Sequence, residues 1–192
     1  MNSSHEITGQ RRKRLTLKFK HKFRDGTADA DIHEHMDTLH DLVLKTNARV
    51  ALELGTKLGN STLAMAEAVK LTRGLLVSID IDPCSIAHAR VSNYGLTDYW
   101  SFIHADDMDV DWTEPLDMLF IDSSHDEKHT YEEIVKYSSF VRPRGVIALH
   151  DTRSFPGVWR AIQKFLDDYY GRFVVEAHYE NNHGLCVLRA TR

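Results

Sequence analysis

Short apolar runs alternate with segments of helical periodicity from residue 49 onward, and this alternation constrains the fold more than any other feature. The apolar runs predict strands at 49–54, 75–80, 100–104, 116–121 and 146–149, with two more at 173–177 and 185–188. Helices are expected at 61–71, 83–94, 131–140 and 156–170. The pattern is typical of an α/β fold, in which a mostly parallel sheet carries helices on both faces.

The first 25 residues differ in character from the remainder. Eight lysines and arginines stand among residues 1–24 against Glu6 alone, which gives this segment a net charge of +7 in a chain of net charge −4. A basic arm on an acidic body could bind nucleic acid, a phosphate-rich substrate or an anionic membrane surface. A solvated tail is favoured, because a charge run alone is weak evidence for a partner.

Residues 26–192 are expected to form a single domain, because a chain of 192 residues fits one domain with its own core. An amphipathic helix is predicted at 28–46, with His33, Glu34 and His35 on a solvated face. No apolar run approaches the roughly 20 residues of a membrane span, and the N-terminus has no apolar signal core. A cytoplasmic protein is therefore expected.

The candidate site residues follow the strands, because ligands of open α/β sheets bind beyond the carboxyl ends of the strands. Gly55 and Gly59 follow the first strand. Gly55 permits a tight turn, and Gly59 allows the chain to approach a ligand closely before the helix begins. This loop lacks the GxGxxG of dinucleotide enzymes and the GK[ST] of phosphate-binding loops.

Acidic residues follow the second and third strands. Asp80 lies about 25 residues beyond Gly55, close to the spacing at which a carboxylate binds the hydroxyls of a ribose. Asp82 competes for this role, although a helix cap suits it better. Asp106 and Asp107 follow the third strand, where they could bond an adenine edge or lie in a solvated turn.

The fourth and fifth strands are each followed by an aspartate and a histidine. Asp122 and His125 follow the fourth strand, and His150 and Asp151 follow the fifth. One such pair would usually be structural, but two pairs that converge on one rim of the sheet favour a functional site.

Together these residues resemble the class I S-adenosylmethionine-dependent methyltransferases, in particular small bacterial O-methyltransferase-like proteins related to catechol O-methyltransferase. The likeness spans roughly residues 49 to 165, in LELGTKLGNST, VSIDIDP, LDMLFIDSSHDEKHTY, and RPRGVIALHDT followed by PGVWRAI. It implies a Rossmann-like three-layer sandwich, whose seven-stranded, mostly parallel sheet has one antiparallel strand from the C-terminal hairpin.

The resemblance also implies which residues bind S-adenosylmethionine. Its methionine part would lie against the first loop and the start of the next helix, at Glu53, Gly55, Thr56, Lys57, Gly59 and Ser61. Asp80, with Ile81 beside it, would bind the ribose. Asp106 and Asp107 would contact the adenine.

The resemblance places the chemistry after the last two parallel strands. Asp122 would contact the cofactor near the point of methyl transfer, and His125 would act as general base. Asp122, His150 and Asp151 take the places of three metal ligands in catechol-type members. A histidine ligand weakens the case for magnesium, whereas manganese, iron or zinc accepts imidazole better.

The chain departs from the family pattern after the fourth strand. The family often has Asp-Gly-x-His-x-Tyr there, but Ser123 replaces the glycine. The residues Asp126 to Thr130 widen the gap between His125 and Tyr131, which puts a site role for Tyr131 in doubt.

The expected reaction is transfer of a methyl group to a small polar acceptor such as a sugar, a phenol or a secondary metabolite. His125 would take the proton of an acceptor hydroxyl, because imidazole titrates near neutral pH, and Asp122 would orient that histidine or bind a metal. An NAD(P)-dependent Rossmann oxidoreductase is an alternative, against which the missing third glycine and the trailing hairpin count. A non-catalytic methyltransferase-like binding domain is another. The sequence leaves open whether the chain forms a homo-oligomer.

Overall fold

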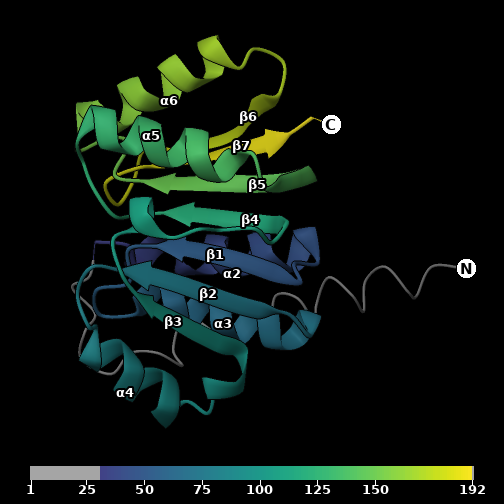
Figure 1. Ribbon diagram of the computed structural model, residues 1–192, viewed down its shortest axis with the longest axis vertical. Coiled ribbons are helices and arrows are strands. Elements are labelled where there is room, and N and C mark those ends of the chain that lie inside the picture. Colours follow the sequence, from purple (N-terminus) through teal and green to yellow (C-terminus); the bar gives the residue numbers. More distant parts are fainter. Residues whose placement is uncertain (1–30, 192) are drawn as a thin grey trace, which may run out of the picture.

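A computed structural model describes residues 31–191, which form one seven-stranded sheet between two layers of helices (Figure 1). The strands are β1 (Val50–Leu54), β2 (Leu75–Asp80), β3 (Trp100–His104), β4 (Leu116–Ile121), β5 (Val141–His150), β6 (Phe173–Tyr179) and β7 (Leu185–Ala190). The α-helices of the described residues are α2 (Met36–Thr46), α3 (Asn60–Thr72), α4 (Ser85–Asn93), α5 (Glu127–Ser138) and α6 (Pro156–Asp168). Single 3-10 turns lie at His33–His35, Thr97–Tyr99 and Asp107–Asp109.

The sheet has the order β3-β2-β1-β4-β5-β7-β6. Strands β1 to β5 are mutually parallel, whereas β7 is antiparallel to both β5 and β6. The α/β class and the antiparallel C-terminal strand predicted from the sequence are therefore confirmed. The chain runs outward from β1 to β3 and then returns to β4, so the switch point of the sheet lies between β1 and β4.

Two hydrophobic cores hold the helices to the sheet. In Figure 1, α5 and α6 lie in front of the sheet, and α2 and α3 lie behind it. Side chains alternate along β1, so Ala51 joins the core with α2, α3 and α4, and Leu52 and Leu54 join the core with α5 and α6. Each fully buried leucine contributes about 2 kcal/mol, so the position of β1 is strongly determined.

Some boundaries differ from those predicted. Helix α5 begins at Glu127 rather than at 131, because the Asp126 carboxylate accepts a hydrogen bond from the His129 N–H and caps the helix. Strand β5 begins at Val141 rather than at 146. An irregularity in its pairing with β4, between Leu116 and Met118, accommodates the Arg-Pro-Arg-Gly segment that resembles a turn in sequence.

The N-terminal predictions are tested only in part. The basic arm at 1–25 and the first residues of the helix predicted at 28–46 lie outside the described residues. Within them, the prediction of a solvated His35 is wrong, because its ring is buried and Nε2 lies 2.9 Å from the Asn181 carbonyl oxygen. Between residues 31 and 191, no helix combines the length and the apolar character that a membrane span requires.

Candidate functional site

A cavity of about 850 Å³ opens at the carboxyl ends of the parallel strands. Its volume falls within the range of about 300–1,000 Å³ that is common for small-molecule sites. Loops after β1, β2, β3, β4 and β5 all contribute to its wall. The predicted site residues that line it are Gly55, Thr56, Lys57, Ser61, Asp80, Ile81, Asp106, Asp107, Asp122, His125 and Asp151.

Gly55 fixes the loop at the switch point of the sheet. Its φ is +87°, and a Cβ atom added there would lie 2.2 Å from the carbonyl oxygen of Asp122. Only glycine combines this left-handed backbone with so close an approach. The tight turn inferred from sequence therefore serves to pack the loop after β1 directly against the backbone after β4.

Gly59 stands at the start of α3 and packs against α4. It has a φ of +79°, and an added Cβ would lie 2.8 Å from Cβ of Ala87 in α4. The residue does not line the cavity. It allows α3 and α4 to pack closely.

Glu53 is also turned away from the cavity. Its side chain is fully buried, and its carboxylate accepts hydrogen bonds from Ser61 Oγ at 2.6 Å, Thr62 Oγ1 at 2.7 Å and Ser78 Oγ at 2.5 Å. Burial raises the pKa of Glu53 to about 7, although the three hydroxyls oppose this change. Glu53 thus links the start of α3 to β2 through these hydrogen bonds. It does not line the cavity.

Asp80 organises the loop after β1. Its Oδ2 accepts hydrogen bonds from the backbone N–H groups of Thr56 at 2.7 Å and Lys57 at 3.0 Å, and its Oδ1 accepts one from Asp82 at 2.8 Å. Burial raises the pKa of Asp80, but these N–H donors outweigh it and hold the pKa below its usual value. An ionised carboxylate therefore stands at the end of β2, in the wall of the cavity.

Asp106 and Asp107 form the wall beyond β3. The Asp106 side chain caps the 3-10 turn by accepting a hydrogen bond from the Met108 N–H at 2.9 Å. The Asp107 carbonyl accepts hydrogen bonds from Lys136 Nζ and Tyr137 Oη of α5. Exposed Ile81 lies on the same wall and offers an apolar surface beside these acids.

His125 is paired with Asp151 rather than with Asp122. Its Nε2 lies 2.6 Å from Asp151 Oδ2, and its ring stacks on Phe155 with the centroids 3.7 Å apart. The Asp151 side chain is 5% exposed, whereas that of His125 is 41% exposed. Asp151 and Phe155 thus hold the accessible imidazole of His125 in a fixed orientation. Its other nitrogen, Nδ1, remains available to accept a proton from a bound molecule.

Asp122, His150 and Asp151 converge at the wall of the cavity. His150 Nδ1 lies 3.2 Å from Asp122 Oδ1 and 3.6 Å from Asp151 Oδ2, while Nε2 lies 2.9 Å from the Asn182 carbonyl oxygen. Burial lowers the pKa of His150, but the two carboxylates outweigh it and raise the pKa to about 10. With Nε2–H donated to a carbonyl, Nδ1 is the nitrogen available to a proton or a metal ion. His150 itself does not line the cavity.

The wall of the cavity is strongly acidic. Among residues 31–191 it contains seven aspartates and one lysine, which are Asp31, Asp80, Asp82, Asp106, Asp107, Asp122, Asp151 and Lys57. Such a wall favours a cationic ligand and disfavours the pyrophosphate of a dinucleotide. The electrostatics of the site therefore count against the NAD(P)-dependent alternative.

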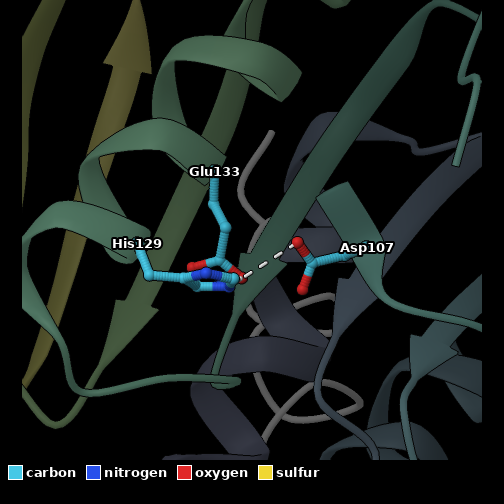
Figure 2. A group of neighbouring side chains, drawn as sticks. All are labelled: Asp107, His129 and Glu133. Atoms are coloured by element: carbon cyan, nitrogen blue, oxygen red, sulfur yellow. Dashed lines mark ion pairs between the residues drawn. The ribbon is translucent and has the colours of Figure 1, made fainter. Parts of the chain in front are cut away.

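Sequence reasoning missed two residues of α5. His129 lines the cavity, and Glu133 lies one turn further along the helix on the same side (Figure 2). His129 lies between two carboxylates, with Nε2 3.8 Å from Asp107 Oδ1 and 3.6 Å from Glu133 Oε1. Their i, i+4 spacing was visible in the sequence, but the helix was predicted to begin after His129.

Comparisons with known proteins agree with the fold. A family model described as "Methyltransferase domain" matches residues 52–152, just over half of the chain. The O-methyltransferase hkm8 of Aspergillus hancockii is 27% identical over 117 residues, which are 59% of this chain and 46% of that protein. The chain thus spans about half the length of this curated relative.

Solved structures share the fold across most of the chain. An O-methyltransferase from Bacillus cereus in complex with SAH superposes with a TM-score of 0.71 at 19% identity, covering 93% of this chain and 90% of that one. The O-methyltransferase TomG from Streptomyces achromogenes, involved in tomaymycin synthesis and solved with SAM, has a TM-score of 0.69 at 19% identity, covering 83% and 81%. At these identities the likeness is one of fold.

Proposed function

Because this chain belongs to the methyltransferase domain family, we propose that it transfers the methyl group of S-adenosylmethionine to a hydroxyl of a small polar acceptor. One observation carries the proposal. The glycine loop after β1, the carboxylate of Asp80 and the His125–Asp151 pair all face a single cavity. The names of the similar proteins, O-methyltransferases with bound SAM or SAH, agree with it.

The donor set of the cavity fits S-adenosylmethionine. This cofactor carries a positive sulfonium and a positive amino group, and seven aspartates in the wall would stabilise both. Asp80 stands where it can accept hydrogen bonds from ribose hydroxyls, while Ile81 offers an apolar face beside it. The loop at Gly55 and Thr56 would hold the methionine part, and Asp106 and Asp107 the adenine.

His125 is the residue that would activate the acceptor. When bound, the cofactor supplies a methyl group that is already activated for displacement. His125 Nδ1 would accept the proton of the acceptor hydroxyl, while Nε2–H donates to Asp151 and stabilises the imidazolium that forms. Phe155, stacked on the imidazole, would keep its plane fixed and exclude water from one face.

A divalent cation would fit the group formed by Asp122, His150 and Asp151. One ligand atom from each lies within 4.8 Å of the others, and the hydrogen bond from His150 Nε2 to Asn182 would orient the imidazole as a ligand. An ion there would lower the pKa of an acceptor hydroxyl that it bound. The set of one imidazole and two carboxylates suits manganese, iron or zinc.

The proposal is tested by cofactor affinity, measured by calorimetry with Asp80→Asn and Asp82→Asn as a matched pair. Both aspartates line the cavity, but only Asp80 holds the loop through Thr56 and Lys57. Loss of a hydrogen bond to a charged group costs about 1.5–3 kcal/mol, so Asp80→Asn should weaken binding by about 10- to 100-fold. Asp82→Asn should change it by less than about threefold. Equal affinities for the two variants, or no binding by the wild type, would contradict the proposal.

A further inference from the structure

A second group of potential ligands lies at the edge of the cavity, separate from Asp122, His150 and Asp151. Asp107 comes from the 3-10 turn after β3, and His129 and Glu133 come from successive turns of α5. Figure 2 shows the imidazole and both carboxylates turned toward one another. One ligand atom from each residue lies within 4.8 Å of the others.

The carboxylates of this group have bonding capacity that the protein leaves unused. Glu133 is fully buried, and among residues 31–191 its Oε2 has no hydrogen-bond partner. Among the same residues, Asp107 Oδ1 is buried and also has no hydrogen-bond partner. Unsatisfied carboxylate oxygens are costly to bury. One of these two, Asp107 Oδ1, also lies 3.8 Å from His129 Nε2, so the group points to a further charged species among the three side chains.

Neighbouring residues hold the Glu133 side chain and the backbone of Asp107 in place. Ser123 Oγ donates a hydrogen bond to Glu133 Oε1, and Lys136 and Tyr137 bind the Asp107 carbonyl. Such outer contacts orient the ligands of metal sites.

We propose that Asp107, His129 and Glu133 form a binding site for a divalent transition-metal ion, with zinc as the best match, that links the turn after β3 to α5. Zinc bonds to imidazole nitrogen and carboxylate oxygen are about 2.0–2.2 Å long, which places tetrahedral ligand atoms about 3.4 Å apart. The separations of His129 Nε2 from Asp107 Oδ1 and Glu133 Oε1 are 3.8 and 3.6 Å. A contraction of a few tenths of an ångström would close the site around the ion.

A proton shared by the two carboxylates is the competing explanation. Burial and then the charge of Glu133 raise the pKa of Asp107 to about 7, and the hydrogen bond with Glu133 is the main cause that raises the pKa of His129 to about 9. Two carboxylates thus lie close to one imidazole at this point. A proton neutralises one carboxylate, whereas a divalent ion neutralises both and also uses the imidazole nitrogen.

The test is zinc binding to the metal-free full-length chain, measured by equilibrium dialysis and metal analysis, with melting temperature as a second readout. His129→Gln and Glu133→Gln remove ligands, and Glu132→Gln is the control on the same helix. His129 is partly exposed, so its variant should fold even if the Glu133 variant does not.

The wild type and Glu132→Gln should each bind one equivalent of zinc more than the ligand variants, and zinc should raise their melting temperatures by more than it raises those of the ligand variants. No saturable binding by the wild type would overturn the proposal in favour of the shared proton. Equal stoichiometry in wild type and ligand variants would overturn it too, because the zinc would then lie at the His150 group. Neither readout depends on methyl transfer, so the proposed function can fail without affecting the result.

Discussion

Replacing Glu53 by glutamine should remove a loss of stability that the wild type suffers as the pH rises. Burial raises the pKa of this carboxyl from 4.5 to about 7. Between these two values the unfolded chain has released its proton while the folded chain still holds it. Folding therefore takes up a proton, and the free energy of unfolding falls as the pH rises through this window.

The size of the effect follows from the pKa values. Each pH unit in the window costs about 1.4 kcal/mol, so the ionised carboxylate destabilises the fold by about 3 kcal/mol in total. Most of this loss, about 2–3 kcal/mol, falls between pH 5 and pH 8. Glutamine has nearly the same shape, cannot ionise, and retains an oxygen that accepts from Ser61, Thr62 or Ser78.

The assay is urea unfolding at several pH values, followed by tryptophan fluorescence. The free energy of unfolding of Glu53→Gln minus that of the wild type should rise by about 2–3 kcal/mol from pH 5 to pH 8. Exposed Glu114 gives the matched control, because Glu114→Gln should leave this difference nearly constant. A difference for Glu53→Gln that does not depend on pH would refute the assignment of a protonated buried carboxyl.

Two further predictions concern the loop and the base. Gly55→Ala should lower the free energy of unfolding in urea by about 3 kcal/mol or more. Gly95 also has a positive φ but open space around it, so Gly95→Ala should lower it by only about 1 kcal/mol. Equal losses in the two variants would contradict the close packing of Gly55 against the backbone after β4. His125→Gln should lower kcat by about 100-fold while cofactor affinity stays within about twofold, and the exposed His88→Gln should change neither. An unchanged kcat in His125→Gln would exclude this residue as the base.

The inner parallel strands were predictable because they are buried on both faces. The apolar runs at β2 and β4 stand out against polar loops, and their predicted bounds agree with the structure. The start of α5 was not predictable from apolar periodicity, because Asp126 caps the helix before its apolar side begins. The missed turn contains His129, so the ligand group on α5 was missed with it.

The candidate site was predictable in position but not in orientation. The rule that ligands bind beyond the strand ends located Asp80, Asp122 and Asp151 at the cavity. It could not show that Glu53 points inward, since that depends on hydroxyls from α3 and β2. Nor could it show that His125 pairs with a residue 26 positions away, because that contact exists only once β4 and β5 lie side by side.

Calorimetric titration of the full-length chain with S-adenosylmethionine, NAD and NADP tests the central claim most directly. The acidic wall of the cavity predicts saturable binding of one S-adenosylmethionine per chain and no measurable binding of either dinucleotide. Binding of a dinucleotide in preference to S-adenosylmethionine, or no binding of S-adenosylmethionine at all, would contradict the account.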